Sequence, residues 1–134
     1  RLGLDVAYSP IDLAIMPSAV AQGTLAVQIC TPFDDRSVAV KDVVSALTCP
    51  KTLAEVTAER ALLAYLDGSC QTPIAASARL HGNNLLTLDG MILSKDGQAA
   101  HRFEMEAPAG DAEALGKAVG VKLLEMAGGR DFLA

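Results

Sequence analysis

Apolar positions in the later part of the chain fall into short segments separated by residues that favour turns. Residues 73–80, 85–94 and 98–106 have the apolar content and the flanking turn residues typical of strands. The connections at 82–84 and 96–97 contain Gly with Asn or Asp, as tight turns between antiparallel strands do. The pattern therefore predicts an antiparallel meander of three strands.

Helical patterns lie on both sides of this meander. Before it, Thr52 and Glu55 form a capping-box pattern ahead of a helix that we expect to stop at Asp67 and Gly68. After it, Asp111 is expected to cap a helix that ends at the glycine pair 128–129. One face of that second helix carries Leu115, Val119, Leu123 and Met126. From about residue 50 onward the sequence thus predicts an α+β unit with helices covering one face of the sheet.

The first 48 residues do not form a closed unit in the same way. Residues 24–30 alternate apolar and polar positions and predict a strand, and a helix capped by Asp34 or Asp35 is expected to end near Leu47. A lone strand is unstable in water because its edges and its apolar face have no partners. Either this strand joins the meander or its sheet lies elsewhere.

Composition narrows the class of protein. The 134 residues suffice for one ordinary domain, and the net charge of −5 comes without any cluster of basic and aromatic residues, so nucleic acid is not expected as a partner. The sequence contains no run of about 18 apolar residues, so no membrane span is predicted. The three cysteines, Cys30, Cys49 and Cys70, show neither a CxxC pair nor a metal-ligand spacing, so no metal site is expected. We expect a soluble cytoplasmic protein with reduced thiols.

Cys70 lies in the segment "VTAERALLAYLDGSCQTPIAASARL", between a helix and the first predicted strand. This segment resembles the cofactor-attachment region of the porphobilinogen deaminase (hydroxymethylbilane synthase) family, where a TAER helix leads into a Gly-Cys-Gln-x-Pro-Ile loop. Upstream, "RLGL" and "MPSAVAQGTLAVQIC" resemble two further stretches of that family, and the final strands and helix resemble its C-terminus. The resemblance extends over essentially the whole chain.

The resemblance implies a three-domain monomeric enzyme of which this chain is the C-terminal portion. Residues 1–16 would end the second domain, 17–22 would be a hinge, and 24–48 would return to the first domain, both of these domains being similar to periplasmic binding proteins. Residues 49–134 would form the third domain, which attaches the cofactor. The N-terminal half would be absent or supplied by a separate polypeptide, which accounts for the orphan strand at 24–30.

The resemblance also implies a chemistry. Cys70 would carry dipyrromethane, two linked pyrrole rings, through a thioether, and porphobilinogen units would be added to this primer with loss of ammonia to give hydroxymethylbilane in heme biosynthesis. Arg60 and Arg1 are similar to arginines that contact the carboxylates of the substrate and cofactor. Gln22 and Gly23 match the hinge.

Some positions depart from the family pattern, and other functions stay open. A hinge glycine of the family is replaced by Ala21. The family's catalytic aspartate lies upstream, and neither Asp67 nor Asp89 matches it, so this chain alone is not expected to catalyse.

Cys30 and Cys49 are expected to be structural, and His81 and His101 to be surface or sheet residues. The alternatives are a small α+β binding module without a covalent cofactor, or a redox-active thiol protein.

Overall fold

A computed structural model describes residue 3 and residues 7–30, 35–68 and 72–133 of the chain. Within these residues two helices come first, α1 (Asp35–Ser45) and α2 (Pro50–Tyr65). Three strands follow, β1 (Ile74–Leu80), β2 (Leu85–Leu93) and β3 (Ala100–Pro108). A short 3-10 turn, η1 (Ala109–Asp111), leads into α3 (Ala112–Ala127), and a second one, η2 (Arg130–Leu133), follows it.

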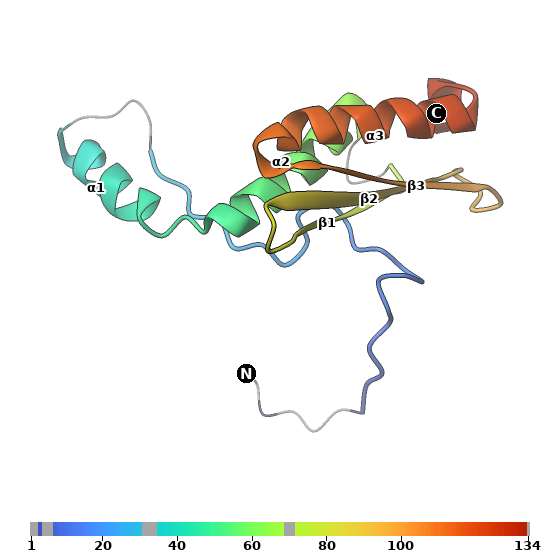
Figure 1. The fold of residues 1–134 in the computed structure, drawn as a ribbon. Coiled ribbons are helices and arrows are strands. Elements are labelled where there is room, and N and C mark those ends of the chain that lie inside the picture. Colours follow the sequence, from blue (N-terminus) through green and yellow to red (C-terminus); the bar gives the residue numbers. More distant parts are fainter. Residues whose placement is uncertain (1–2, 4–6, 31–34, 69–71, 134) are drawn as a thin grey trace.

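The strands form the predicted meander. They lie in the order β1-β2-β3, with both pairs antiparallel, and Leu88 of β2 is opposite Ala78 of β1 and Met105 of β3. Figure 1 shows α2 and α3 side by side on one face of the sheet. The α+β class and the one-sided helical cover predicted from the sequence are therefore confirmed.

The core lies between the helices and this sheet face. Every second residue of β2 is buried there, because side chains alternate across a strand. Among the described residues, the largest fully buried side chains are Leu62, Leu86, Leu88, Ile92, Val119 and Leu123. At roughly 1.5–3 kcal/mol for each large apolar side chain removed from water, this layer is the main source of stability.

The predicted start of α2 is wrong. The helix begins at Pro50, two residues before Thr52, with Cys49 as its N-cap residue. Proline suits this first helical position because its missing N–H would have no partner there and its fixed φ is helical. Thr52 and Glu55 therefore lie inside the helix, and Glu55 instead accepts a hydrogen bond from the Leu80 amide at 2.9 Å.

The predicted apolar stripe of α3 is correct except at its end. Leu115, Val119 and Leu123 are buried, but Met126 is 47% exposed and Leu124 is buried instead. The buried face of α3 is turned toward its two glycines, 116 and 120, which pack against α2. Met126 consequently falls at the margin of that face.

The segment before α2 lies largely outside the core. Residues 24–30 form no strand in the structure, and Leu25 is 97% exposed, so the strand expected there is not formed and does not join the meander. Helix α1 stands apart from the sheet and its helices (Figure 1), with Val43 68% exposed. Among the described helices, none is long and apolar enough to cross a bilayer.

Candidate functional site

The end of α2 forms the near stem of the loop that contains Cys70. Asp67 adopts the left-handed conformation with φ 52°, and the Gly68 amide donates to the Leu63 carbonyl at 3.0 Å, which closes the last turn. A Cβ at Gly68 would come within 2.4 Å of a Leu63 side-chain carbon and 2.7 Å of one from Ile74. Glycine at this position therefore lets the chain leave the helix close to the core without displacing the Leu63 and Ile74 side chains.

Arg130 fastens this stem from the C-terminal end of the chain. Its guanidinium donates to the Asp67 carboxylate at 2.7 Å and to the Tyr65 carbonyl at 2.8 Å. The same group lies 5.5 Å from the centre of the Tyr65 ring, within the range of a cation–π contact. The last carbonyls of a helix lack intrahelical partners, so this arginine satisfies one of them and holds the helix end in place.

The far stem of the loop is joined to the sheet. The Leu93 amide at the end of β2 donates to the Pro73 carbonyl at 3.0 Å, and the Ile74 amide donates to the Thr72 carbonyl at 2.8 Å. Both stems are thus fixed to the core. Cys70 itself lies outside the described residues, as does Arg1, so the roles predicted for these two residues stay predictions.

Arg60 lies on the outer side of the helix pair. It is exposed and lines a groove of about 570 Å³ between α2 and α3, whose other walls are mostly apolar side chains such as Leu53, Val56 and Ala64. Lys117, at the rim, donates to Glu113 at 2.6 Å, and this pairing lowers the pKa of Glu113 below its ordinary value. Within the described residues no carboxylate pairs with Arg60. Its guanidinium is therefore available to an external anion.

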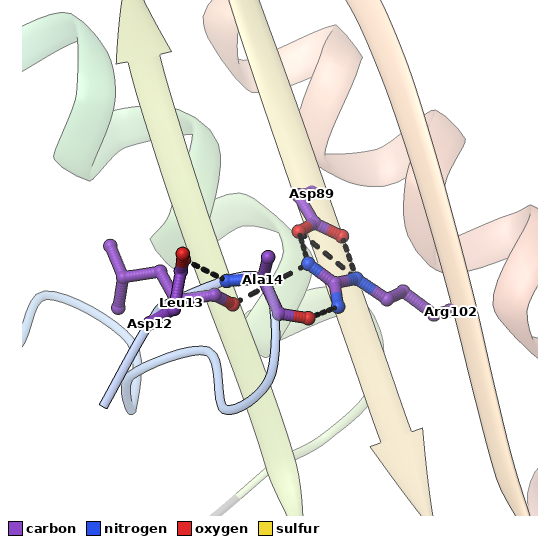
Figure 2. Close-up of polar contacts among 5 residues, drawn as sticks. All are labelled: Asp12, Leu13, Ala14, Asp89 and Arg102. Carbon is purple, nitrogen blue, oxygen red and sulfur yellow. Dashed lines mark hydrogen bonds and ion pairs between the residues drawn. The ribbon is translucent and has the colours of Figure 1, made fainter.

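The opposite face of the sheet holds the beginning of the chain. Arg102 of β3 forms a bidentate ion pair with Asp89 of β2, with Nε 2.9 Å from Oδ1, and also donates to the carbonyls of Leu13 and Ala14 (Figure 2). Asp89 raises the pKa of Arg102, chiefly through these hydrogen bonds. Bidentate arginine–carboxylate pairs have a fixed geometry. Asp89 thus orients Arg102 toward the backbone of residues 13–14.

The predicted hinge lies at the edge of β1. The Ser18 carbonyl accepts a hydrogen bond from the Ala76 amide at 3.1 Å, and the Ala21 amide donates to Glu59 Oε2 at 2.7 Å. Gly23 has φ 82°, a conformation that glycine adopts without Cβ strain, and Gln22 is exposed. The hinge role predicted for Gln22 and Gly23 remains a prediction, but the backbone at 23 does require glycine.

Other candidate groups form no reactive cluster among the described residues. Cys30 and Cys49 are free, exposed thiols, and the structural role expected for them stays a prediction. His81 Nε2 lies 2.9 Å from Thr87 Oγ1, and His101 packs against the Phe132 ring. The described part of the chain contains no group of His, Cys, Asp and Glu side chains that could hold a metal ion.

Comparison with known proteins identifies the family. The family model of the porphobilinogen deaminase C-terminal domain matches residues 53–125. The chain belongs to this family. A porphobilinogen deaminase of Geobacter sulfurreducens is 41% identical over 137 aligned residues, which span the whole of this chain and 41% of that relative. The match to the porphobilinogen deaminase C-terminal domain covers most of α2, the sheet and most of α3, and so includes the stems of the cysteine loop.

Sequence reasoning missed three residues that organise this part of the molecule. Glu59 belongs to the TAER motif, and the motif does not indicate its contact with the hinge at Ala21. Arg130 was missed because its partner Asp67 is 63 residues away in the chain. Arg102 was missed because, besides Asp89 at 13 residues, it binds backbone carbonyls up to 89 residues away. For Glu59 one signal was present, a carboxylate between Ala58 and Leu62 on the face of the helix that packs into the core.

Proposed function

We propose that this chain is the cofactor-carrying portion of a cytoplasmic hydroxymethylbilane synthase. In this function Cys70 holds dipyrromethane through a thioether, and porphobilinogen units are added to it with loss of ammonia. The main support is the joint occurrence of the family match across 53–125 and a cysteine loop whose two stems are both fixed to the core. The chain spans 41% of the length of its relative, so the activity of the whole enzyme is part of this proposal.

The described residues around the loop fit such a group. A bulky adduct on Cys70 needs a thiol on a segment that leaves the core, and Gly68 and Pro73 provide a defined exit and return on either side of it. When bound, dipyrromethane supplies the primer to which the pyrrole units are attached. Arg60 suits the carboxylate side chains of pyrrole substrates because its guanidinium is exposed and free of internal partners among the described residues.

Asp67 beside the loop and Asp89 on the sheet do not suit the role of general acid. Asp67 is ion-paired with Arg130 and Asp89 with Arg102, so both serve as counter-ions that position other groups. Proton transfer at a pyrrole requires a carboxylate within hydrogen-bond reach of the reacting ring. We therefore propose that this carboxylate, and most of the cationic pocket, lie on the part of the enzyme outside this chain.

Intact mass spectrometry tests the attachment site. In the full protein, wild type should carry the added mass of dipyrromethane, and Cys70→Ser should carry none, because an alcohol is a much weaker nucleophile than a thiolate near neutral pH. Cys49→Ser is the matched control, since it removes another exposed thiol of the same chain and should keep the full adduct. Retention of the adduct by Cys70→Ser, or its loss in Cys49→Ser alone, would refute the assignment.

Turnover of porphobilinogen tests the division of labour. The 134-residue chain alone should produce no hydroxymethylbilane, and activity should appear when the remaining part of the enzyme is supplied. Oxidation of the product to a coloured porphyrin gives a direct readout. Turnover by the isolated chain would place a catalytic acid among these residues, whereas a chain that never gains the adduct or activity in any context would favour a binding module.

A further inference from the structure

Residues 12–21 wrap around the outer edge of β1 and contact the domain on three sides. Arg102 binds the carbonyls of residues 13 and 14 on the open face of the sheet. The Ser18 carbonyl pairs with the Ala76 amide at the strand edge. Beyond that edge, Ala21 reaches Glu59 on α2. The hinge is therefore held against the domain by hydrogen bonds and is not a free linker.

Glu59 of α2 connects the end of segment 12–21 to strand β1. Its side chain accepts from the Ala21 amide at 2.7 Å through Oε2 and from the Ala78 amide at 2.8 Å through Oε1. The residue is 9% exposed. Burying a carboxylate is costly unless hydrogen bonds replace its hydration, and here each oxygen has one backbone partner. The position of Ala21 is thereby tied to that of β1.

The backbone conformation of Ala21 also indicates that this position is held in place. Its φ of 58° is uncommon for a residue with a Cβ and costs of order 1 kcal/mol. Such a conformation persists where the surroundings determine it. Glu59 fixes the amide of this residue, and Val20 next to it packs against the core. The direction in which the chain leaves the domain is set at this point.

We propose that Glu59 is a positioning residue that fixes the joint between the C-terminal domain and the rest of the enzyme. It acts through the backbone of Ala21 and touches neither substrate nor cofactor in this role. The consequence for catalysis rests on the proposed function, because a fixed joint determines where the domain presents its cysteine loop to the remaining domains. The structural part of the proposal stands independently of that function.

Amide hydrogen exchange on the 134-residue chain tests the joint. Glu59→Met keeps the side-chain length and removes both acceptors, so exchange at the Ala21 and Ala78 amides should accelerate at least tenfold. Glu59→Gln keeps one acceptor oxygen and should preserve protection at one of the two amides. Glu55→Gln is the matched control: Glu55 lies one helical turn earlier and bonds the Leu80 amide, so the Ala21 amide should exchange as in wild type.

The outcomes separate clearly. Wild-type exchange at Ala21 and Ala78 in Glu59→Met would overturn the proposal, and if that variant loses its helical circular dichroism signal, wild-type protection of both amides in Glu59→Gln would overturn it equally. Faster exchange at Ala21 in Glu55→Gln would also count against it, because the effect would then not be specific to Glu59.

Kinetics of the full enzyme test the functional consequence. Glu59→Met should lower kcat at least tenfold with KM changed less than threefold and with the mass of the attached cofactor unchanged, and Glu59→Gln should recover part of the loss. Unchanged kcat in Glu59→Met would refute a positioning role. If wild type itself does not convert porphobilinogen, the proposed function fails, while the exchange experiment still decides whether Glu59 holds the hinge.

Discussion

Gly116 of α3 lies so close to Ala58 of α2 that a Cβ at position 116 would come within 2.3 Å of the Ala58 carbonyl oxygen. The same Cβ would lie 2.8 Å from the Leu62 backbone nitrogen. Neither atom can move without shifting helix α2 as a whole. The two helices therefore owe their close approach to the absence of a side chain at this position.

Gly116→Ala should destabilise the protein by about 1–3 kcal/mol, since overpacking a close contact outweighs the gain of about 1 kcal/mol from the better helix propensity of alanine. Urea unfolding followed by circular dichroism measures the change. Gly110→Ala is the control, because a Cβ at Gly110 meets nothing within 4 Å and should be neutral or slightly stabilising. Equal stability of the two variants would show that α2 and α3 can separate at little cost.

Ala21→Gly should leave stability unchanged or raise it by up to about 1 kcal/mol. Glycine removes the strain of the left-handed φ, and its greater freedom in the unfolded chain offsets part of the gain. The urea midpoint measures the effect. Ala19→Gly should instead lower stability by up to about 1 kcal/mol, because Ala19 has no positive φ to relieve. A loss in Ala21→Gly as large as in Ala19→Gly would contradict the strained joint.

Arg130→Gln should destabilise the protein by about 0.5–1.5 kcal/mol, chiefly through loss of the bond to the Tyr65 carbonyl and the contact with its ring. The ion pair with Asp67 is largely exposed and should contribute little. Asp67→Asn, which removes this pair and keeps a residue tolerant of left-handed φ, should therefore be close to neutral. If both variants lose the same stability in thermal unfolding, the ion pair is the main contribution.

Alkylation of Cys49 should be faster at mildly alkaline pH than for an ordinary thiol. The Thr52 hydroxyl, followed by backbone N–H groups of the first turn of α2, lowers the pKa of Cys49 below its ordinary value of 9.0. A lowered pKa means that the reactive thiolate is populated at lower pH. In a background with Cys30 and Cys70 replaced by Ser, the inflection of the iodoacetamide rate against pH should lie below that of a free cysteine measured in the same buffer.

Thr52→Val keeps the shape of the side chain and removes the hydroxyl, so the inflection should move upward. An inflection that does not move in Thr52→Val would show that the backbone of the helix start, and not Thr52, stabilises the thiolate.

Sequence patterns predicted secondary structure correctly where the local apolar pattern matches the face that the fold buries. The apolar content of residues 85–94 and the turn residues on both sides predicted β2, and one face of that strand is indeed packed under the helices. The start of α2 was misplaced because Thr52 and Glu55 match a capping box by chance. Glu55 is held by a strand 25 residues later, and no local pattern reports such a contact.

The contacts that hold the hinge against the domain could not be predicted for a similar reason. The position of Glu59 on the buried face of α2 is visible in the sequence, but its partner Ala21, 38 residues earlier, is brought against it only by the fold. Arg102 and Asp89 are visible as charges on the outer face of the meander. The other acceptors of Arg102, however, are the backbone carbonyls of Leu13 and Ala14, and a carbonyl leaves no signature in a sequence.

The hydrogen bonding at the outer edge of β1 affects the tendency of the protein to aggregate at high concentration. Its amides at residues 76, 78 and 80 would ordinarily invite a strand from another molecule, and such pairing is a common route to aggregation. Here Ser18, Glu59 and Glu55 already occupy them. Two of these acceptors are carboxylates, which repel an approaching backbone carbonyl. Two of the groups that block strand addition at β1, Ser18 and Glu59, are therefore also the ones that hold residues 12–21 against the domain.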